Sequence, residues 1–175
     1  LESRHDIGGN IIPMLTERGE AKVYDFANNV VPGETPRDKG YWRDVGSIDA
    51  YFDAHMDLVS VHPIFNLYNR DWPLLTNPPS LPPAKFSEGG IAQDSIVAAG
   101  SIIAGGHLGH TVTGYDVHVG SGAYVDHAVL MPNVLVGDRA VIRRAIIDKG
   151  VVVENGAQIG VDLERDRQRF TVTES

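Results

Sequence analysis

Aliphatic residues recur through the second half of the chain at steps of six, six and five positions. The series is Ile96, Ile102, Leu108, Thr113, Val119, Val125, Leu130, Val136, Ile142, Ile147, Val153 and Ile159. All but Thr113 are Ile, Leu or Val, so the pattern is a 17-residue repeat with three short sides. A coil this small cannot bury its apolar face alone, and stacked coils share one core. The pattern therefore predicts a triangular parallel β-helix of about four coils.

A second series, two residues before each aliphatic position, holds mostly small side chains: Asp94, Gly100, Gly106, Thr111, Val117, Ala123, Ala128, Val134, Ala140, Ala145, Val151 and Ala157. Because side chains alternate along a strand, residues i and i−2 share a face, and both series are expected to point inward. The same alternation predicts an aliphatic outer surface at Ile103, Val129, Met131, Leu135, Val141, Ile146 and Val152. That much outward apolar surface favours a homo-oligomer.

The first half of the chain follows helical and strand patterns instead. Residues 6 to 18 predict a helix that ends at Gly19. Residues 21 to 26 and 41 to 45 alternate as short strands, and Ser47 is placed to cap a helix over residues 48 to 59. Two helices and two strands bury too little to stand alone, which indicates the end of a larger α/β domain.

The resulting fold class is α/β plus β, in four segments. Residues 1–62 are expected to be the C-terminal part of a larger α/β domain, and residues 63–90 a proline-rich connector. Residues 91–160 form the β-helix, and residues 161–175 a C-terminal tail that is expected to be truncated.

Composition narrows the function classes. The net charge is −8 and the basic residues are scattered, which argues against nucleic-acid binding. No apolar stretch approaches the roughly 18 residues that span a bilayer, so no membrane partner is expected. The chain has no cysteine, which excludes thiolate chemistry and is compatible with the cytoplasm.

The densest group of chemically useful residues is Tyr41 to Gly46. Ligands of α/β sheets bind at the carboxyl ends of strands, where Asp44 could hold Mg²⁺ and Trp42 could stack on a sugar. The alternative is structural: Asp44 caps the helix that follows and Trp42 is a core residue.

The coils also carry His107, His110, His118 and His127. His110 and His127 lie one full repeat apart and are expected to stack, with Arg144 continuing the column. Two histidines make an incomplete zinc site, because Arg144 stands where a third ligand would follow. A histidine base for acyl transfer, and a solvent-exposed polar column near a subunit contact, are the other interpretations.

Three motifs in order resemble one family. YWRDVGSIDAY at residues 41–51, NLYNRDWP at 66–73 and LPPAKF at 81–86 are similar to the junction of bacterial glucose-1-phosphate adenylyltransferase, also called ADP-glucose pyrophosphorylase. The resemblance continues through the coils to residues 164–170. It departs from the family at Ile7, where the family usually has an aromatic residue. It implies a nucleotidyltransferase α/β domain followed by a left-handed parallel β-helix, of which this chain is the C-terminal portion.

The resemblance also implies an activity. The family forms ADP-glucose and pyrophosphate from ATP and glucose 1-phosphate for glycogen synthesis, with Mg²⁺ as cofactor. Asp44 matches a carboxylate that binds the metal, and Asp6 and Trp42 match residues of the glucose 1-phosphate pocket. Lys149 matches a basic position used for phosphorylated metabolite effectors. The family assembles as a homotetramer.

The family's glycine-rich phosphate loop matches nothing in these residues. Gly8 and Gly9 belong to a helical pattern, so the loop is expected to lie upstream of residue 1. The chain alone is therefore expected to be inactive, and the alternatives are a hexapeptide-repeat acyltransferase or a non-catalytic oligomerisation module.

Overall fold

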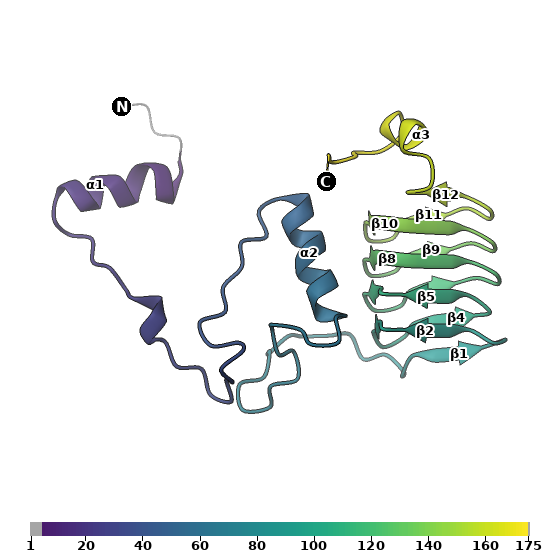
Figure 1. Cartoon of the computed structure of the whole chain (residues 1–175), viewed down its shortest axis with the longest axis horizontal. Helices are drawn as coiled ribbons and strands as arrows, with labels where there is room; N and C mark the ends of the chain where they lie inside the picture. The colour runs from purple at the N-terminus through teal and green to yellow at the C-terminus, as the bar shows by residue number, and fades with distance from the viewer. Residues whose placement is uncertain (1–4, 175) are drawn as a thin grey trace.

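The computed structural model describes residues 5–174 and combines an extended N-terminal segment with a stacked β-helix (Figure 1). The helical elements are the π-turn Ile7–Ile11, α1 (Ile12–Glu17), the 3₁₀ turn Phe26–Asn28, α2 (Ile48–Leu58) and α3 (Leu163–Arg167). The strands are β1 (Lys85–Ser87), β2 (Ile91–Gln93), β3 (Ile96–Val97), β4 (Ile102–Ala104), β5 (His107–Gly109), β6 (Val112–Thr113), β7 (His118–Val119), β8 (Tyr124–Leu130), β9 (Leu135–Val136), β10 (Val141–Ile147), β11 (Val152–Val153) and β12 (Gln158–Ile159).

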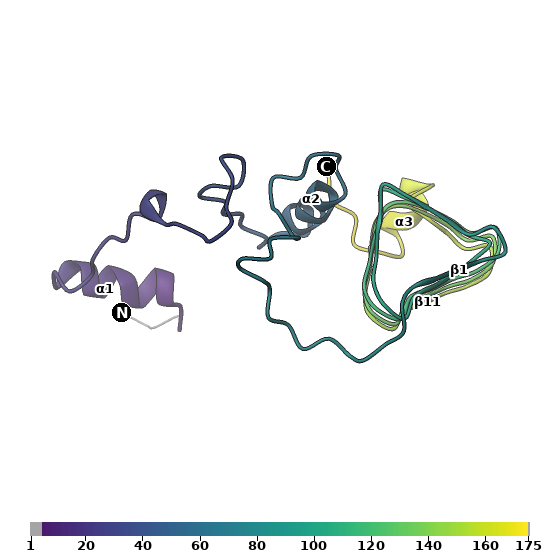
Figure 2. The ribbon, with the colours of Figure 1, turned by 90° about the horizontal axis from the view of Figure 1, so that it is seen from below.

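The coils stack as a triangular prism of about four turns, and every strand pair is parallel (Figure 2). One side is the sheet β1-β4-β7-β9-β11, and a second is formed by β2, β5, β8, β10 and β12. On the third side β3 pairs with β6, β6 with the second half of β8, and that half with the second half of β10. The predicted β-helix is confirmed, and its left-handed sense stays a prediction from the resemblance.

β8 and β10 each turn one corner of the triangle. Their corner residues, His127 and Arg144, have φ values of 47° and 45°, in the left-handed region. His110 holds the same corner one coil earlier, with a φ of 44°. The three side chains therefore project from equivalent corners, as the repeat predicts.

The interior of the prism is a dry aliphatic core. It contains Ile103, Leu108, Val117, Val119, Ala123, Val125, Ala128, Leu130, Val134, Val136, Ala140, Ile142, Ile147 and Val153, all nearly or fully buried. From Leu108 onward these residues match the two predicted inward series. The sequence repeat therefore identified the core of the later coils correctly.

The first coil is one position shorter than the later coils. Its register pairs Val97 with Thr113 and Ile103 with Val119. Val97 packs on the core and Ile103 is 0% exposed, whereas Ile102 is partly exposed. The predictions that Ile96 and Ile102 point inward and that Ile103 points outward are therefore wrong.

Two serines explain this register. Ser101 is fully buried, and its hydroxyl accepts from Val117 N and lies 3.3 Å from the Gly114 carbonyl, to which it donates. Ser95 Oγ accepts from Thr111 N at 3.0 Å. In the register of the later coils Asp94 would point inward, which would bury a carboxylate without a partner. Satisfied serine hydroxyls fill that space instead.

Helix α2 covers one outer face of the prism, as Figures 1 and 2 both show. Val129 of β8 lies outside the core cluster, as predicted, yet it is only 3% exposed because α2 packs beside β8. Val59, at the end of α2, is buried outside the same core. Other outer residues remain open: Leu135 is 42% exposed and Val152 is 64% exposed.

The N-terminal helices follow the sequence, but the two strands do not. Ser47 caps α2 through a hydrogen bond from Ala50 N to Ser47 Oγ, and the helix predicted for residues 6–18 forms as the π-turn and α1. Residues 21–25 and 41–45 have no regular secondary structure and pair with no strand among residues 5–174. The strand predictions are wrong there, because an alternating segment becomes a strand only beside a hydrogen-bonding neighbour.

β1 lies within the stretch that the sequence assigns to the connector, and it pairs with β4 as the first strand of the prism. At the other end, α3 follows β12, and the buried Asp166 accepts a hydrogen bond from Gly160 N at 2.8 Å.

Within the described residues no helix combines the length and the apolar character needed to cross a membrane.

Candidate functional site

Trp42 and Asp44 lie in the loop that leads into α2. The side chain of Trp42 is 73% exposed, so its interpretation as a core residue is wrong. Asp44 Oδ1 accepts from Gly46 N at 2.8 Å, which closes a local turn, while Ser47 caps the helix. The capping role considered for Asp44 therefore belongs to Ser47, and the Asp44 carboxylate is exposed.

The loop before α2 is held by contacts with the connector. The ring of Tyr41 packs on that of Phe65, with centroids 5.1 Å apart. Asn69 Nδ2 donates to the Pro32 carbonyl at 2.8 Å, which joins two segments far apart in the sequence. The chain just before Trp42 is therefore anchored to the connector.

Asp6 serves as the N-cap of the π-turn, where its carboxylate accepts from Gly9 N. Gly8 and Gly9 lie inside this helical turn, as expected, and do not form a loop. Figures 1 and 2 show α1, which follows the turn capped by Asp6, well apart from α2, the helix that follows Trp42 and Asp44.

Lys149 lies on a corner of the prism. It follows β10 and its side chain is exposed. Its backbone N–H donates to Asp148 Oδ1 at 2.7 Å, and the next residue, Gly150, donates to the carbonyl of Pro132 in the preceding coil. The lysine is thus held at a fixed point on the solenoid surface.

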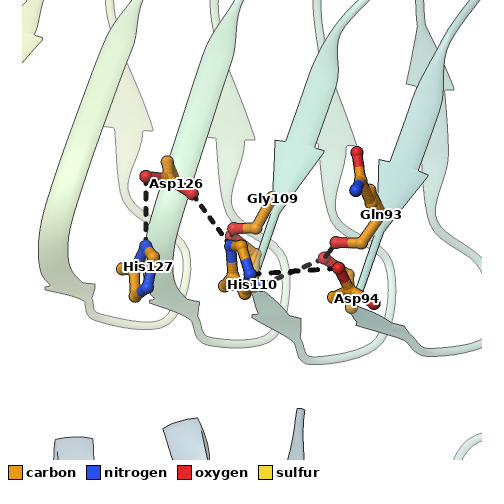
Figure 3. A network of polar contacts seen from close by, with 8 residues as sticks. Gln93, Asp94, Gly109, His110, Asp126 and His127 are labelled. Atoms are coloured by element: carbon orange, nitrogen blue, oxygen red, sulfur yellow. Dashed lines mark hydrogen bonds and ion pairs between the residues drawn. The ribbon is translucent and has the colours of Figure 1, made fainter. Parts of the chain in front are cut away.

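The most connected polar group lies at the corner that faces α2 (Figure 3). The rings of His110 and His127 stack with centroids 4.4 Å apart and an interplanar angle of 23°. Asp126 lies between them: its Oδ1 is 3.3 Å from His110 Nδ1, and its Oδ2 is 3.0 Å from His127 Nδ1. Asp94 approaches from the previous coil, with Oδ2 3.9 Å from His110 Nε2.

The two histidines set the charge state of Asp126. Partial burial of the carboxyl group would by itself raise its pKa, but hydrogen bonds from His127 and His110, together with their charge, outweigh this effect. The pKa of Asp126 therefore lies below its usual value of 3.8, and the group is a carboxylate at neutral pH. The pair of histidines thus shares one negative partner.

The predicted histidine stack is confirmed, but the carboxylate beside it was missed at the level of sequence. Asp126 precedes His127 directly and lies outside the column of corner residues that leads to Arg144. Its strand register is the signal that could have found it, since Asp126 pairs with Gly109, the residue before His110.

A hydrophobic pocket adjoins the same histidines. Met56, Val59 and Ser60, from the end of α2 and the residues after it, line it together with His110 and His127. The contact between α2 and the prism therefore has a polar rim at one corner and an apolar floor beside it.

Comparison with known proteins gives two matches in the expected order along the chain. Residues 82–175 match the family described as GlmU-like, C-terminal hexapeptide, over more than half of the chain. The chain belongs to the GlmU-like C-terminal hexapeptide family. Residues 1–61 match the family described as nucleotidyl transferase.

This hexapeptide chain also resembles part of several curated proteins. Glucose-1-phosphate adenylyltransferase of Corynebacterium efficiens is 65% identical over 173 residues, which are 98% of this chain and 42% of that relative. The proteins of the same name from Rhodococcus opacus and Nocardia farcinica are 63% and 62% identical over 98% of this chain and 43% of their own length. The chain thus spans about two fifths of these relatives. The resemblance inferred from its motifs is confirmed.

Proposed function

We propose that this chain is part of a glucose-1-phosphate adenylyltransferase, which joins ATP and glucose 1-phosphate into ADP-glucose for glycogen synthesis. The observation that carries the proposal is identity of 56–65% over 98% of the chain to relatives of that name. In the reaction a phosphate oxygen of glucose 1-phosphate attacks the α-phosphorus of ATP, and pyrophosphate leaves. Such a transfer depends mainly on positioning the reactants and neutralising charge.

Trp42 and Asp6 are the proposed contacts to glucose 1-phosphate. The exposed indole of Trp42 offers a flat apolar surface of the kind that packs against a sugar ring. Asp6 offers a carboxylate that can accept hydrogen bonds from sugar hydroxyl groups. For Asp6 to take part, the N-terminal turn has to lie against the loop before α2 in the assembled enzyme.

Asp44 is the proposed Mg²⁺ ligand. One of its carboxylate oxygens accepts the Gly46 amide, and the exposed group leaves its other oxygen for a cation. Mg²⁺ is commonly held by one or two carboxylates plus substrate phosphates and water, so one carboxylate of this chain fits such a site. When bound, the ion neutralises charge on the ATP phosphates. The Gly46 hydrogen bond fixes the carboxylate that holds it.

The β-helix is the proposed oligomerisation and regulatory unit. Leu135 and Val152 leave apolar surface on the β7-β9-β11 side, which a second subunit would cover. Lys149 offers a fixed cation for phosphorylated effectors. A homotetramer in the cytoplasm is the assembly we propose.

A chimera tests the function directly. The corresponding 173 residues of the Corynebacterium efficiens relative are replaced with those of this chain, and the product is supplied with ATP, glucose 1-phosphate and Mg²⁺. We expect ADP-glucose by mass spectrometry. A folded chimera that makes none, while the unaltered relative does, would refute the proposal, and acetyl transfer from acetyl-CoA would become the next activity to assay.

A further inference from the structure

We propose that His110, Asp126 and His127 form a binding site for a divalent transition-metal ion such as Zn²⁺, at the β-helix corner beside α2. The site is separate from the proposed Mg²⁺ ligand Asp44 and does not depend on the proposed activity.

The ligand geometry suits one ion. Each of the three residues offers one ligand atom, and these atoms lie within 4.8 Å of one another. Zinc bonds of roughly 2.0–2.2 Å place the ligands of a tetrahedral ion about 3.3 Å apart. Asp126 Oδ1 is 3.3 Å from His110 Nδ1, and Oδ2 of the same carboxylate is 3.0 Å from His127 Nδ1, so each imidazole nitrogen already has a carboxylate oxygen at close to that separation.

The backbone positions the three proposed ligand residues next to one another. His110 and His127 occupy equivalent corners of consecutive coils, so their rings stack without side-chain rearrangement. Asp126 lies beside Gly109 in the parallel register. A Cβ atom at Gly109 would lie 2.8 Å from Asp126 Oδ1, so a larger residue there would displace the carboxylate from its present position.

A further carboxylate lies near the site. Asp94 Oδ2 is 3.9 Å from His110 Nε2, on the opposite side of the ring from the proposed metal ligand Nδ1 and just beyond hydrogen-bond distance. Histidine ligands usually donate their second N–H to a carboxylate, and a small shift of the Asp94 side chain would allow that contact. Figure 3 shows Asp94, His110, Asp126 and His127 following one another along this corner.

The chemistry of the ligands selects the ion. Two imidazole nitrogens and one carboxylate suit Zn²⁺ and related transition metals, whereas Mg²⁺ and Ca²⁺ prefer oxygen alone. Three protein ligands leave a fourth position, and the pocket lined by Met56, Val59 and Ser60 adjoins the two histidines. The ion would tie two consecutive coils together next to α2.

Titration of the full chain with Zn²⁺, in excess Mg²⁺ and against a competing chelator, tests the site. We expect one ion per chain. Asp126→Asn and His127→Asn should each weaken binding about 100-fold or more, because even an outer-shell partner typically contributes roughly 10- to 100-fold. Asn suits the positive φ of His127, and circular dichroism checks that each variant is folded.

His118→Asn is the matched control. His118 lies on β7, in the other sheet of the prism, with its Nε2 3.7 Å from Asp116, and the variant should bind Zn²⁺ as the unaltered chain does. Co²⁺ provides a measurement on the unaltered chain alone, since tetrahedral nitrogen and oxygen ligation gives strong visible absorption. Absence of stoichiometric Zn²⁺ binding, an octahedral Co²⁺ spectrum, or unchanged affinity in folded Asp126→Asn and His127→Asn variants would overturn the proposal.

Discussion

Ile103 lies beside Val119 in the parallel ladder, although the two are one position closer in sequence than the paired residues of the later coils. Val119 and Val136, for example, pair across one full 17-residue repeat. A one-residue change in register reverses which side chains face the core. The first coil therefore buries Ile103 and leaves Ile102 on the outer surface.

Truncation of these two neighbours distinguishes the registers. Ile103→Ala should lower the free energy of unfolding by about 2–5 kcal/mol, because it opens a cavity in a closely packed core. Ile102→Ala should cost about 1 kcal/mol or less, as expected for a partly exposed side chain. Urea denaturation of both variants measures the difference, and a larger loss for Ile102→Ala would favour the register of the later coils.

Gly160 is expected to be irreplaceable for two reasons. Its φ is 73°, and an added Cβ would lie 1.8 Å from the Arg143 carbonyl oxygen. Gly150 has a φ of 68° but no atom within 4 Å of the added Cβ, so it isolates the cost of the backbone conformation. We expect Gly150→Ala to cost about 1–2 kcal/mol and Gly160→Ala about 2–5 kcal/mol. Thermal or urea unfolding compares them, and equal losses would show that the Arg143 contact is relieved without cost.

The Asp126 carboxylate should make the stability of the folded chain depend on pH in the acidic range. Because its pKa is depressed in the folded chain, its contribution is fully present above the unfolded value near 3.8 and is lost as pH falls through the folded pKa. The neighbouring charged groups are His110, His127 and Asp94, together with Arg143, which pairs with Asp126 in the parallel ladder. We expect the stability advantage over Asp126→Asn to shrink from pH 5 downward. An advantage that grows below pH 4 would contradict the assigned direction.

The β-helix was predictable from the sequence because the same pattern of inward-facing residues recurs in each coil. Ser47 and α2 were also predictable, since a cap acts on backbone groups close to it in sequence. The first coil was misread because Ser95 and Ser101 look polar and yet point inward with their hydroxyl groups satisfied. The strands predicted at residues 21–26 and 41–45 failed because pairing depends on a neighbour that local pattern does not reveal.

The candidate sites, like the fold, were only partly predictable from the sequence. The stacking of His110 and His127 follows from their spacing, but the role of Asp126 depends on which side of a corner its carboxylate occupies. Asp6, Trp42, Asp44 and Lys149 were identified by resemblance alone. Their roles remain predictions, since all four side chains are exposed and only Trp42 and Asp44 belong to the same loop.

Lys149 should affect regulation rather than turnover. In the chimera, Lys149→Ala should weaken the response to a panel of phosphorylated sugars and inorganic phosphate by about 10-fold, the loss expected for one charge-assisted contact. Turnover without effectors should be nearly unchanged. Lys85→Ala, at another exposed lysine of the prism, is the control. Identical effector curves for both variants would reject the assignment of Lys149.

The Mg²⁺ dependence of ADP-glucose formation in the chimera tests the central claim most directly, measured with Asp44 and with Asp44→Asn. Loss of a carboxylate that holds the ion should lower turnover about 100-fold or more and raise the Mg²⁺ concentration needed for half-maximal rate. Asp49→Asn, in the first turn of α2, should leave both quantities close to those of the unaltered chimera. A folded Asp44→Asn chimera with near-normal turnover at the same Mg²⁺ concentration would contradict the account.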